Sequence, residues 1–295
     1  MAREVVIGTS SWADEGFVRE WYPPGLPAKR RLAHYAQYFR AVEVNSTFYN
    51  VPSRKMVARW AQVTPANFSF DVKLHRALSR HVAWRSSLPE HLQRIAECES
   101  SGRLRLTPRL QDALLDELLA ALEPLREAGK LSSLLLQLAP SFAPRTHRLD
   151  ELDSLIGRIS PLRLAIEFRH RGWVEPACLG DTLDYLRRRS VAFVCVDAPA
   201  GVHDTIMPSD LDAVTCGQLA YLRAHGRNTH GYLHGRTVAE RFAYKYSDPE
   251  LLQMIARAKR MAGALDKGDT RVMLNNNRGS DAPEAARRML ELLGQ

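Results

Sequence analysis

Cysteine is scarce in this sequence of 295 residues, which contains four cysteines in all. They are Cys98, Cys178, Cys195 and Cys216, and no two of them have the C-x-x-C spacing of a redox or zinc motif. This argues against a disulfide-rich scaffold and against a cysteine-based metal knuckle. A reducing compartment, the cytoplasm, is therefore expected.

Long apolar runs and glycine-rich nucleotide motifs are also missing. No stretch approaches the ~20 apolar residues that a membrane-spanning helix needs, and the first segment, MAREVVIGTS, leads directly into a strand-like pattern. We therefore expect neither a transmembrane helix nor a signal segment, and no membrane partner. No G-x-G-x-x-G or G-x-x-x-x-G-K-[ST] follows a strand-like segment, which argues against dinucleotide-binding and P-loop folds.

The composition that remains is that of a globular protein with a basic excess. The chain is 45% hydrophobic and 25% charged, and its net charge of +8 favours anionic partners. Two stretches, 75–105 and 223–245, contribute +3 and +4 of this charge and hold six of the ten histidines. The basic residues are interleaved with aromatic residues, which suits a phosphate-bearing small molecule or single-stranded nucleic acid.

Strand-like segments recur eight times along the chain, at 5–10, 41–48, 68–75, 132–139, 162–169, 191–198, 218–225 and 270–277. Helical patterns fall between most of them, with clear examples at 30–39, 53–63, 110–129, 248–265 and 281–293. Strands that alternate with helices predict a parallel sheet, and eight of them favour a closed (β/α)₈ TIM barrel over an open sheet. We predict a single domain over residues 1–295, with long loops after strands 3 and 7.

Alternation within the strands predicts which side chains point into the barrel. In the segment 191–198, for example, it predicts Val194 and Val196 outward and Asp197 inward. Inward-pointing side chains at strand ends should meet at the mouth of the barrel. They are Glu43, Asn45, Thr47, Asp71, Lys73, His75, Gln137, Glu167, Arg169, Cys195, Asp197, Tyr221, Arg223, His225, Asn275 and Asn277.

Charged groups that converge at a barrel mouth have three interpretations. Glu43, Glu167, Asp71 and Lys73 would be catalytic acid–base groups in an enzyme. Alternatively, the acids and bases pair with one another and only plug the barrel. A third interpretation is a divalent metal held by the carboxylates and histidines, with Mg²⁺ or Mn²⁺ favoured over zinc because no H-x-H or H-E-x-x-H spacing occurs.

Other polar and aromatic residues near strand ends are predicted to bind substrate. Arginines would bind phosphate oxygens through paired N–H donors, asparagines would orient the ligand, and aromatic rings would stack on it. The predicted substrate-binding residues are Thr9, Trp12, Asn45, Gln137, Arg169, Trp173, Asp197, Arg223, His225, Arg227, Tyr244, Asn275 and Asn277.

An ordered set of segments gives the chain a family resemblance. IGTSSW, WYPPGLP, VEVNSTFY, FDVKLHRALSRH, LQLAPSF, AIEFRHRGW, AYLRAHGR, YKYSDPEL and VMLNNNRG run in this order from about residue 5 to 280. Together they resemble the YecE-like family, a bacterial and archaeal domain of unknown function. The resemblance implies a TIM barrel and a cytoplasmic protein. A proposed kinship with the endonuclease IV and xylose isomerase barrels would imply metal-assisted chemistry or nucleic-acid binding, although this chain lacks their histidine-rich metal set.

Two functions follow from these observations. The leading hypothesis is a hydrolase-like or phosphoesterase-like enzyme that acts on a phosphate-bearing or nucleic-acid substrate at the carboxyl-terminal mouth of the barrel. The alternative is a protein that binds nucleic acid or a phosphate-bearing ligand without catalysis. Turnover that is lost in Glu167→Gln would favour the enzyme.

Overall fold

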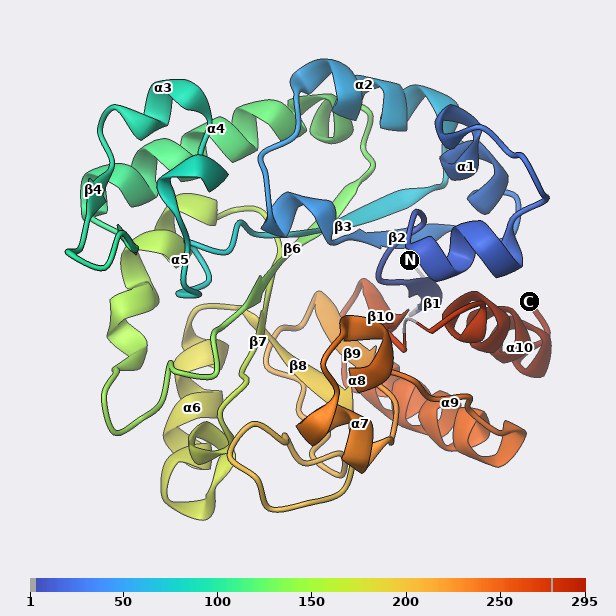
Figure 1. Cartoon of the computed structure of the whole chain (residues 1–295). Helices are drawn as coiled ribbons and strands as arrows, with labels where there is room; N and C mark the ends of the chain where they lie inside the picture. Colours follow the sequence, from blue (N-terminus) through green and yellow to red (C-terminus); the bar gives the residue numbers. More distant parts are fainter. Residues whose placement is uncertain (1–3, 277) are drawn as a thin grey trace.

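The computed structural model describes residues 4–276 and 278–295 and is a closed barrel of eight parallel strands (Figure 1). Around the barrel the strand order is β1-β10-β9-β8-β7-β6-β3-β2. The strands are β1 (Glu4–Thr9), β2 (Ala41–Val44), β3 (Ser69–Lys73), β6 (Leu131–Gln137), β7 (Leu164–Glu167), β8 (Ala192–Asp197), β9 (Leu219–Ala224) and β10 (Asp269–Leu274). The predicted (β/α)₈ class is confirmed, and each predicted strand overlaps one barrel strand.

Most of the helices surround the strands on the outside of the barrel (Figure 1). The helices are α1 (Ala28–Tyr35), α2 (Arg54–Val63), α3 (Glu90–Gln93), α4 (Pro108–Glu127), α5 (Asp153–Ile159), α6 (Pro176–Arg188), α7 (Thr229–His234), α8 (Val238–Arg241), α9 (Asp248–Gly263) and α10 (Asp281–Leu293). The five helices predicted from the sequence correspond to α1, α2, α4, α9 and α10. Short helical turns complete the set: η1 (Phe17–Trp21), η2 (Ser46–Phe48), η3 (Arg85–Ser87), η4 (Leu149–Leu152) and η5 (Arg171–Val174).

The connections between strands and helices differ in length, and the two longest contribute residues to the mouth of the barrel. The segment after β3 contains α3, a two-stranded sheet of β4 (Glu97–Cys98) and β5 (Leu104–Arg105), and α4. The segment after β9 contains α7 and α8 before it reaches α9. Both long insertions were predicted. The connection from β8 to β9, all of it described, is irregular and has no helix.

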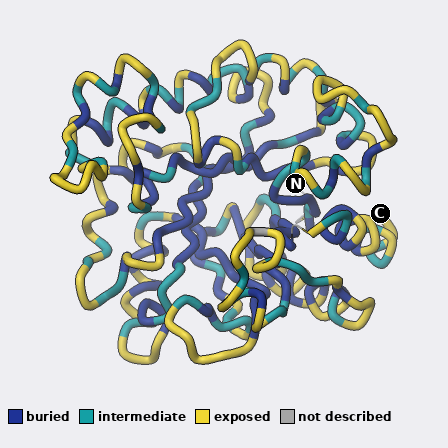
Figure 2. The backbone as a smooth tube through the Cα atoms, viewed as in Figure 1, coloured by how far each residue is buried: buried dark blue, intermediate teal, exposed yellow. Residues whose placement is uncertain are grey.

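The barrel strands are buried on both faces, as expected of a parallel sheet covered by helices. Figure 2 shows the central strands as buried and the outer helices and loops as largely exposed on their outer sides. Closure joins the two ends of the chain, because β1 pairs with β10 from Glu4 opposite Asp269 to Thr9 opposite Leu274. At Gly8 a Cβ atom would overlap the backbone oxygen of Ala41, so a glycine lets β1 and β2 approach.

The strand register corrects the predicted phase of β8. Val196 pairs in register with Arg223, whose side chain points into the barrel. Because paired residues of neighbouring parallel strands point to the same side, Val196 points inward and Cys195 and Asp197 point toward the helix layer. Accordingly, Arg257 of α9 lies 3.7 Å from a carboxylate oxygen of Asp197. The inward assignment of Cys195 and Asp197 is therefore wrong.

No described helix combines the length and the apolar character that crossing a bilayer would require.

Candidate active site

A buried ion-pair network lies in the barrel at the carboxyl ends of the strands, with Arg223 of β9 at its centre. The guanidinium donates from Nε and Nη2 to the two oxygens of Glu43 on β2, at 2.9 and 2.6 Å. Its Nη1 donates to Oε2 of Glu167 on β7 at 2.5 Å. The hydroxyl of Tyr221 also donates to Glu43, at 2.9 Å. Three strands that are far apart in sequence are thus joined by one side chain.

Glu167 is the second residue of this network that contacts several others. Its Oε2 also accepts from Nε2 of Gln137 at 2.9 Å, and its Oε1 lies 3.0 Å from Nε2 of His225 and 3.3 Å from Nη1 of Arg169. Nδ2 of Asn275 donates to Nδ1 of His225 at 3.0 Å. Nε2 of His225 must therefore carry the proton that it shares with Glu167, so the imidazole is a neutral donor.

The network keeps its central groups charged. Burial opposes ionisation of Glu167, but the charge of Arg223 and the hydrogen bond from His225 outweigh it and hold the pKa of Glu167 well below its usual value. Burial likewise opposes the charge of Arg223, and Glu43 and Glu167 overcome it and raise the Arg223 pKa. Burial lowers the pKa of His225 to about 4. At neutral pH Glu167 is therefore a fixed anion and has no proton to give.

Lys73, at the end of β3, has a different environment. Its Nζ donates to Oε1 of Gln137 at 2.8 Å and lies 4.2 Å from the centre of the Phe48 ring. Among the described residues no carboxylate forms an ion pair with this amine. Burial, followed by the charge of Arg223, lowers the pKa of Lys73 to about 7. Lys73 is thus the network member whose protonation changes near neutral pH.

Arg169 follows β7 and forms the second cationic group next to Lys73. Its Nη2 donates to the hydroxyl of Tyr232 at 2.7 Å, and that hydroxyl donates to the backbone oxygen of Thr205 at 2.7 Å. Burial opposes the charge of Arg169, but Tyr232 and Glu167 raise its pKa, so the guanidinium stays protonated. Two loops, 198–218 and 225–246, therefore fix the position of Arg169.

A cavity of about 730 Å³ opens above this network. Its floor is formed by strand-end residues, namely Asn45, Lys73, Gln137, Arg169, Arg223 and Asn275. The walls come from the segments that follow β1, β2, β3, β9 and β10, and they include Asp14, Phe48, Tyr49, His81, Phe242 and Arg278. Six of the residues predicted from the sequence thus share one cavity.

Three buried polar atoms in this cavity have no hydrogen-bond partner within the described part of the chain. They are Oδ2 of Asp14, Oδ1 of Asn45 and Nδ1 of His81. The amide nitrogen of Asn45 is occupied, because it donates to the backbone oxygen of Ser10 at 2.5 Å. Burial, followed by the charges of Lys73 and Arg169, lowers the pKa of His81 to about 4, so this imidazole is neutral. Polar atoms without a partner therefore line the cavity and are available to a ligand.

Asp71 lies below the mouth. It accepts from the Ser133 hydroxyl at 2.6 Å and lies 3.5 Å from Nε of Arg271, and burial raises its pKa. These partners form a separate polar layer deeper in the barrel, where a ligand in the cavity does not reach. The prediction of a catalytic Asp71 at the mouth is therefore wrong.

Asp197 and Arg227, both predicted to bind substrate, pair with each other outside the cavity. Arg227 donates from Nη2 to Asp197 at 2.8 Å and from Nη1 to Glu250 at 3.3 Å. The Tyr246 hydroxyl also donates to Asp197, at 2.9 Å. The outward phase of β8 explains this position. This cluster holds the segment after β9 against α9.

The three predicted stacking aromatics do not line the cavity. Trp12 packs edge-on against Trp60 of α2 with ring centres 5.4 Å apart. Trp173 is buried and donates from Nε1 to the backbone oxygen of Phe142 at 2.6 Å. The Tyr244 hydroxyl donates to Glu250 at 2.5 Å. These rings attach loops and helices to the barrel, whereas Phe48, Tyr49 and Phe242, which the sequence analysis did not single out as site residues, face the cavity.

The last two predicted binding residues are Thr9 and Asn277. Thr9 points to the helix layer, where its Oγ1 lies 2.9 Å from the hydroxyl of Tyr35 on α1, so its assignment to the mouth is wrong. Strand β1 places Gly8 rather than Thr9 on the inner side. Asn277 lies outside the described residues.

The carboxylates do not fit a metal site. Glu43 and Glu167 direct their oxygens at Arg223, Tyr221 and Gln137. Within residues 4–276 and 278–295, no group of three or more His, Cys, Asp or Glu side chains is arranged to hold an ion. We therefore derive no step that involves a metal.

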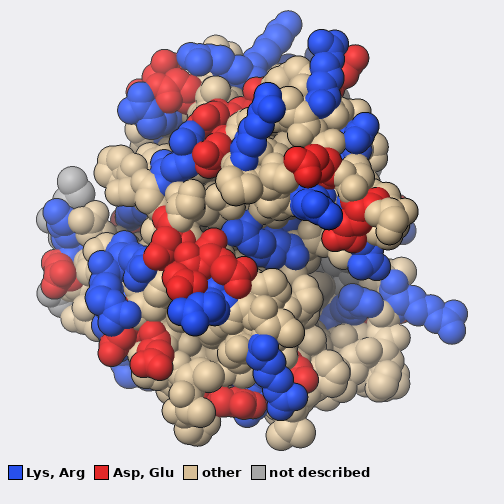
Figure 3. Space-filling model, turned by 90° about the vertical axis from the view of Figure 1, so that its left-hand side faces the viewer, with Lys and Arg blue, Asp and Glu red and all other residues tan. Residues whose placement is uncertain are grey.

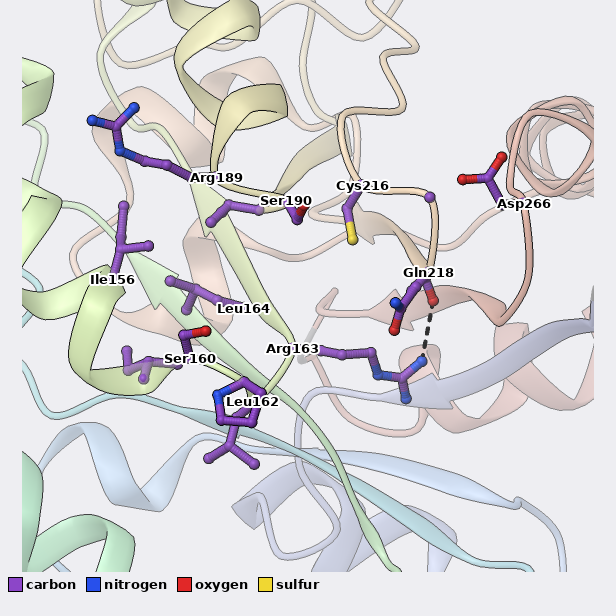
Figure 4. Close-up of a pocket in the computed structure, with 14 residues that line it drawn as sticks. Ile156, Ser160, Leu162, Arg163, Leu164, Arg189, Ser190, Cys216, Gln218 and Asp266 are labelled. Atoms are coloured by element: carbon purple, nitrogen blue, oxygen red, sulfur yellow. Dashed lines mark hydrogen bonds between the residues drawn. The ribbon is translucent and has the colours of Figure 1, made fainter.

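A smaller hollow, of about 240 Å³, lies at the opposite end of the barrel, where β7, β8 and β9 begin (Figure 4). Arg163 lies in it and donates to the backbone oxygen of Gln218 at 3.2 Å and to Asp269 at 2.6 Å. These bonds join the start of β7 to the starts of β9 and β10, which are not its neighbours in the barrel, and none of the predicted site residues lies here. In TIM barrels the amino-terminal face serves stability, so the mouth is the candidate site.

Comparisons with known proteins match nearly the whole chain or a large part of it. A family model described as "Protein of unknown function DUF72" matches residues 6–295. The UPF0759 protein YunF of Bacillus subtilis is 26% identical over 293 residues, which cover 98% of this chain and 94% of YunF. The UPF0759 protein YecE of Escherichia coli K12 is 27% identical over 197 residues, which cover 66% of this chain and 59% of YecE.

Solved structures show the same fold. A DUF72 family protein from Thermotoga maritima superposes with a TM-score of 0.77 and 26% identity, covering 99% of this chain and 100% of that protein. A DUF72 family protein from Enterococcus faecalis gives a TM-score of 0.76 and 23% identity, covering 99% and 98% of the two chains. These likenesses establish the barrel and carry no statement about a reaction.

Proposed function

This chain belongs to the DUF72 family of proteins of unknown function, and we propose that its barrel mouth is the active site of an enzyme for a phosphate-bearing small molecule. One observation carries the proposal: the buried amine of Lys73 faces a cavity beside the guanidinium groups of Arg169 and Arg223. Within the described residues this amine has a neutral amide, and no carboxylate, as its hydrogen-bond acceptor.

The floor of the cavity favours an anion. Lys73, Arg169 and Arg223 face Glu43 and Glu167, which leaves one positive charge in excess when Lys73 is protonated. An excess positive charge attracts an anion more strongly in a site with little water than on the surface, because the effective dielectric constant is lower there. Phosphate oxygens would offer the remaining N–H groups of Arg169 charge-assisted hydrogen bonds. Binding of an anion would therefore be coupled to protonation of Lys73.

The roles of the charged groups differ from those predicted from sequence. Lys73 has a pKa of about 7, which suits a general acid or base at neutral pH. Glu167, predicted as a catalytic acid–base group, serves in this proposal as a fixed anion, and Glu43 joins it in holding Arg223 in place. Arg169 is the phosphate-binding group. The positive charge of Arg223 acts on Lys73 and lowers its pKa. Hydrolase chemistry stays a prediction.

A small molecule is favoured over single-stranded nucleic acid. The cavity is a confined space of about 730 Å³, and the predicted stacking residues Trp12, Trp173 and Tyr244 lie elsewhere. Figure 3 shows Lys and Arg side chains beside Asp and Glu side chains over one face of the molecule, without a continuous basic surface there. A backbone-tracking site would need such a surface.

The alternative is a protein that binds a phosphate-bearing ligand without turnover. The pairing of Glu43 and Glu167 with Arg223 supports it, because it takes both carboxylates out of proton transfer. A Lys73→Met variant separates the two functions. An enzyme would lose turnover with this variant, whereas a binding protein would show a reduced affinity only.

Binding of inorganic phosphate and glycerol 3-phosphate, measured by isothermal titration calorimetry, tests the proposal. We expect Arg169→Gln to weaken binding at least tenfold, because it removes the phosphate-binding guanidinium. Arg227→Gln is the matched control, since this arginine was also predicted to bind substrate but pairs with Asp197 outside the cavity. Equal losses in both variants, or no binding to the wild-type protein at millimolar ligand, would contradict the proposal.

A further inference from the structure

We infer that Lys73 forms an imine with its substrate, and that the substrate is a hydroxylated aldehyde or ketone that carries a phosphate group. The inference deepens the proposed function and rests on it, because the phosphate is held by Arg169 while the amine reacts. It assigns a covalent step and a substrate class to the cavity.

The chain contains a second buried lysine, and the contrast between the two shows what is special about Lys73. Nζ of Lys130 donates to the backbone oxygens of Ala61 and Thr64 at 2.6 and 2.7 Å and to Oγ1 of Thr64 at 3.0 Å. Burial lowers the pKa of Lys130 too, but three oxygens hold its amine in a structural role. Lys73 has one amide acceptor and a phenyl ring, and it lines the cavity.

Burial, followed by the guanidinium groups of Arg223 and Arg169, favours the neutral amine of Lys73, which is the nucleophilic form. Glu43 and Glu167 act in the opposite direction, but both carboxylates pair directly with Arg223 and neither pairs with Lys73. A lysine that is desolvated next to another cation is a known form of activated amine. With a pKa of about 7 in the ligand-free cavity, Lys73 has a substantial neutral fraction at pH 7. A bound phosphate group stabilises the ammonium and so lowers this fraction.

The unpartnered atoms of the cavity identify the rest of the ligand. Oδ1 of Asn45 is a buried acceptor, so a ligand that satisfies it must donate. Oδ2 of Asp14 is buried too and accepts when the carboxyl group is ionised, although burial raises the pKa of Asp14. Hydroxyl groups are uncharged donors that fit this need. Phe48 and Phe242 add apolar surface for the carbon skeleton. Together with the phosphate and the carbonyl, these requirements describe a sugar phosphate in its open-chain form.

The covalent step needs no reactant other than the amine of Lys73 and the carbonyl group of the substrate. The lone pair of neutral Nζ attacks the carbonyl carbon, a C–N bond forms, and the carbonyl π electrons move to oxygen, which takes up the proton that nitrogen releases. In the carbinolamine the nitrogen lone pair then forms the C=N bond while the C–O bond breaks. The departing hydroxyl takes up the second proton of the nitrogen and leaves as water. The net change is amine plus carbonyl to imine plus water, with no oxidation or reduction. His81, whose pKa is affected by the Lys73 charge, has an unpartnered Nδ1 that can relay this proton.

Reductive trapping tests the inference on the intact chain. The probes are glyceraldehyde 3-phosphate and dihydroxyacetone phosphate, each added with sodium cyanoborohydride, which reduces an imine to a stable secondary amine. Peptide mass spectrometry then locates the adduct. We expect Lys73 to be modified at least tenfold faster than the exposed Lys245, and inorganic phosphate to slow this reaction. Lys73→Arg should abolish the adduct, and Lys245→Arg should leave it unchanged.

Three outcomes separate the inference from the proposed function. Preferred modification of Lys73 that phosphate suppresses supports both. Phosphate binding that depends on Arg169, with Lys73 modified no faster than Lys245 by either probe, overturns the imine and leaves the phosphate site intact. Absence of both phosphate binding and Lys73 modification overturns both. Because the adduct is mapped in the wild-type protein, the test does not depend on the folding of a variant.

Discussion

At the residue scale, the barrel mouth separates charges that are fixed from one that can change. Arg223 holds Glu43 and Glu167 at hydrogen-bond distances, and Arg223 and Glu167 keep each other ionised across the neutral range. Lys73 lies against the same network but donates to an amide. A fixed field next to one titratable amine is the arrangement by which proteins bring a lysine into the working pH range.

His225 provides a pH-dependent test of the network. Its pKa is about 4 in the folded protein, below the value of about 6.5 for an unperturbed histidine, because burial disfavours the cation. Between these values the unfolded chain binds a proton at this position that the folded chain does not. The free energy of unfolding should therefore fall as pH falls from 6.5 to 4, by an amount on the order of 3 kcal/mol from this residue.

Urea unfolding of the wild-type protein and of His225→Gln, measured at several pH values, checks this prediction. Glutamine can donate to Glu167 and accept from Asn275 as His225 does, but it does not titrate. The variant should lose less stability than the wild type between pH 6.5 and 4. Parallel curves for the two proteins would show that His225 is not held neutral by the fold.

Part of the site can be predicted from the sequence, for a physical reason. Alternation in β2, β3 and β9 places Glu43, Lys73 and Arg223 opposite aliphatic neighbours, so their inward direction could be predicted from the pattern. The pairing of Glu43 and Glu167 with one guanidinium could not, because it depends on which strands face each other across the barrel. His81 and Phe48 were missed because they lie in loops after strands, where no period indicates direction.

At the element scale, strand positions were predictable and the phase of β8 was not. The interior of this strand, Ala192–Val196, is apolar at every position, and only Asp197 at its end is polar. Parallel strands are buried on both faces, so an apolar run does not show which face is inward. The pattern therefore predicts the polar end residue Asp197 to point inward, whereas its partners are Arg227 and Tyr246 outside the cavity.

The corrected phase leads to a prediction for Asp197. Asp197→Asn removes the charge that pairs with Arg227 and should lower the free energy of unfolding by about 1–3 kcal/mol. Phosphate affinity should stay within twofold of the wild type, because this carboxylate does not face the cavity. Chemical unfolding and calorimetry on the same preparation measure both quantities. A large change in phosphate affinity with unchanged stability would show that Asp197 lies at the mouth of the barrel and contradict the corrected phase.

At the scale of the whole molecule, the barrel serves to bring distant segments to one point. The eight strands close through β1 and β10, and the cavity walls come from segments between residues 14 and 279. Family membership and fold agree with the sequence prediction. Neither of them identifies a reaction, so the proposed reaction rests only on the geometry of the site. A single domain over residues 1–295 and a cytoplasmic location stay predictions.

The central claim is that the mouth couples anion binding to the protonation of Lys73, and one NMR titration tests it directly. The protein is labelled with ¹³C-lysine, and the Lys73 signal is assigned by its absence in Lys73→Arg. Without ligand, we expect the Lys73 signal to titrate at about pH 7. With inorganic phosphate, its midpoint should move to higher pH, because the oxyanion stabilises the ammonium, while the exposed Lys245 should not respond. A Lys73 midpoint among those of the exposed lysines, near ~10.4, or one that phosphate leaves unchanged, would contradict the account.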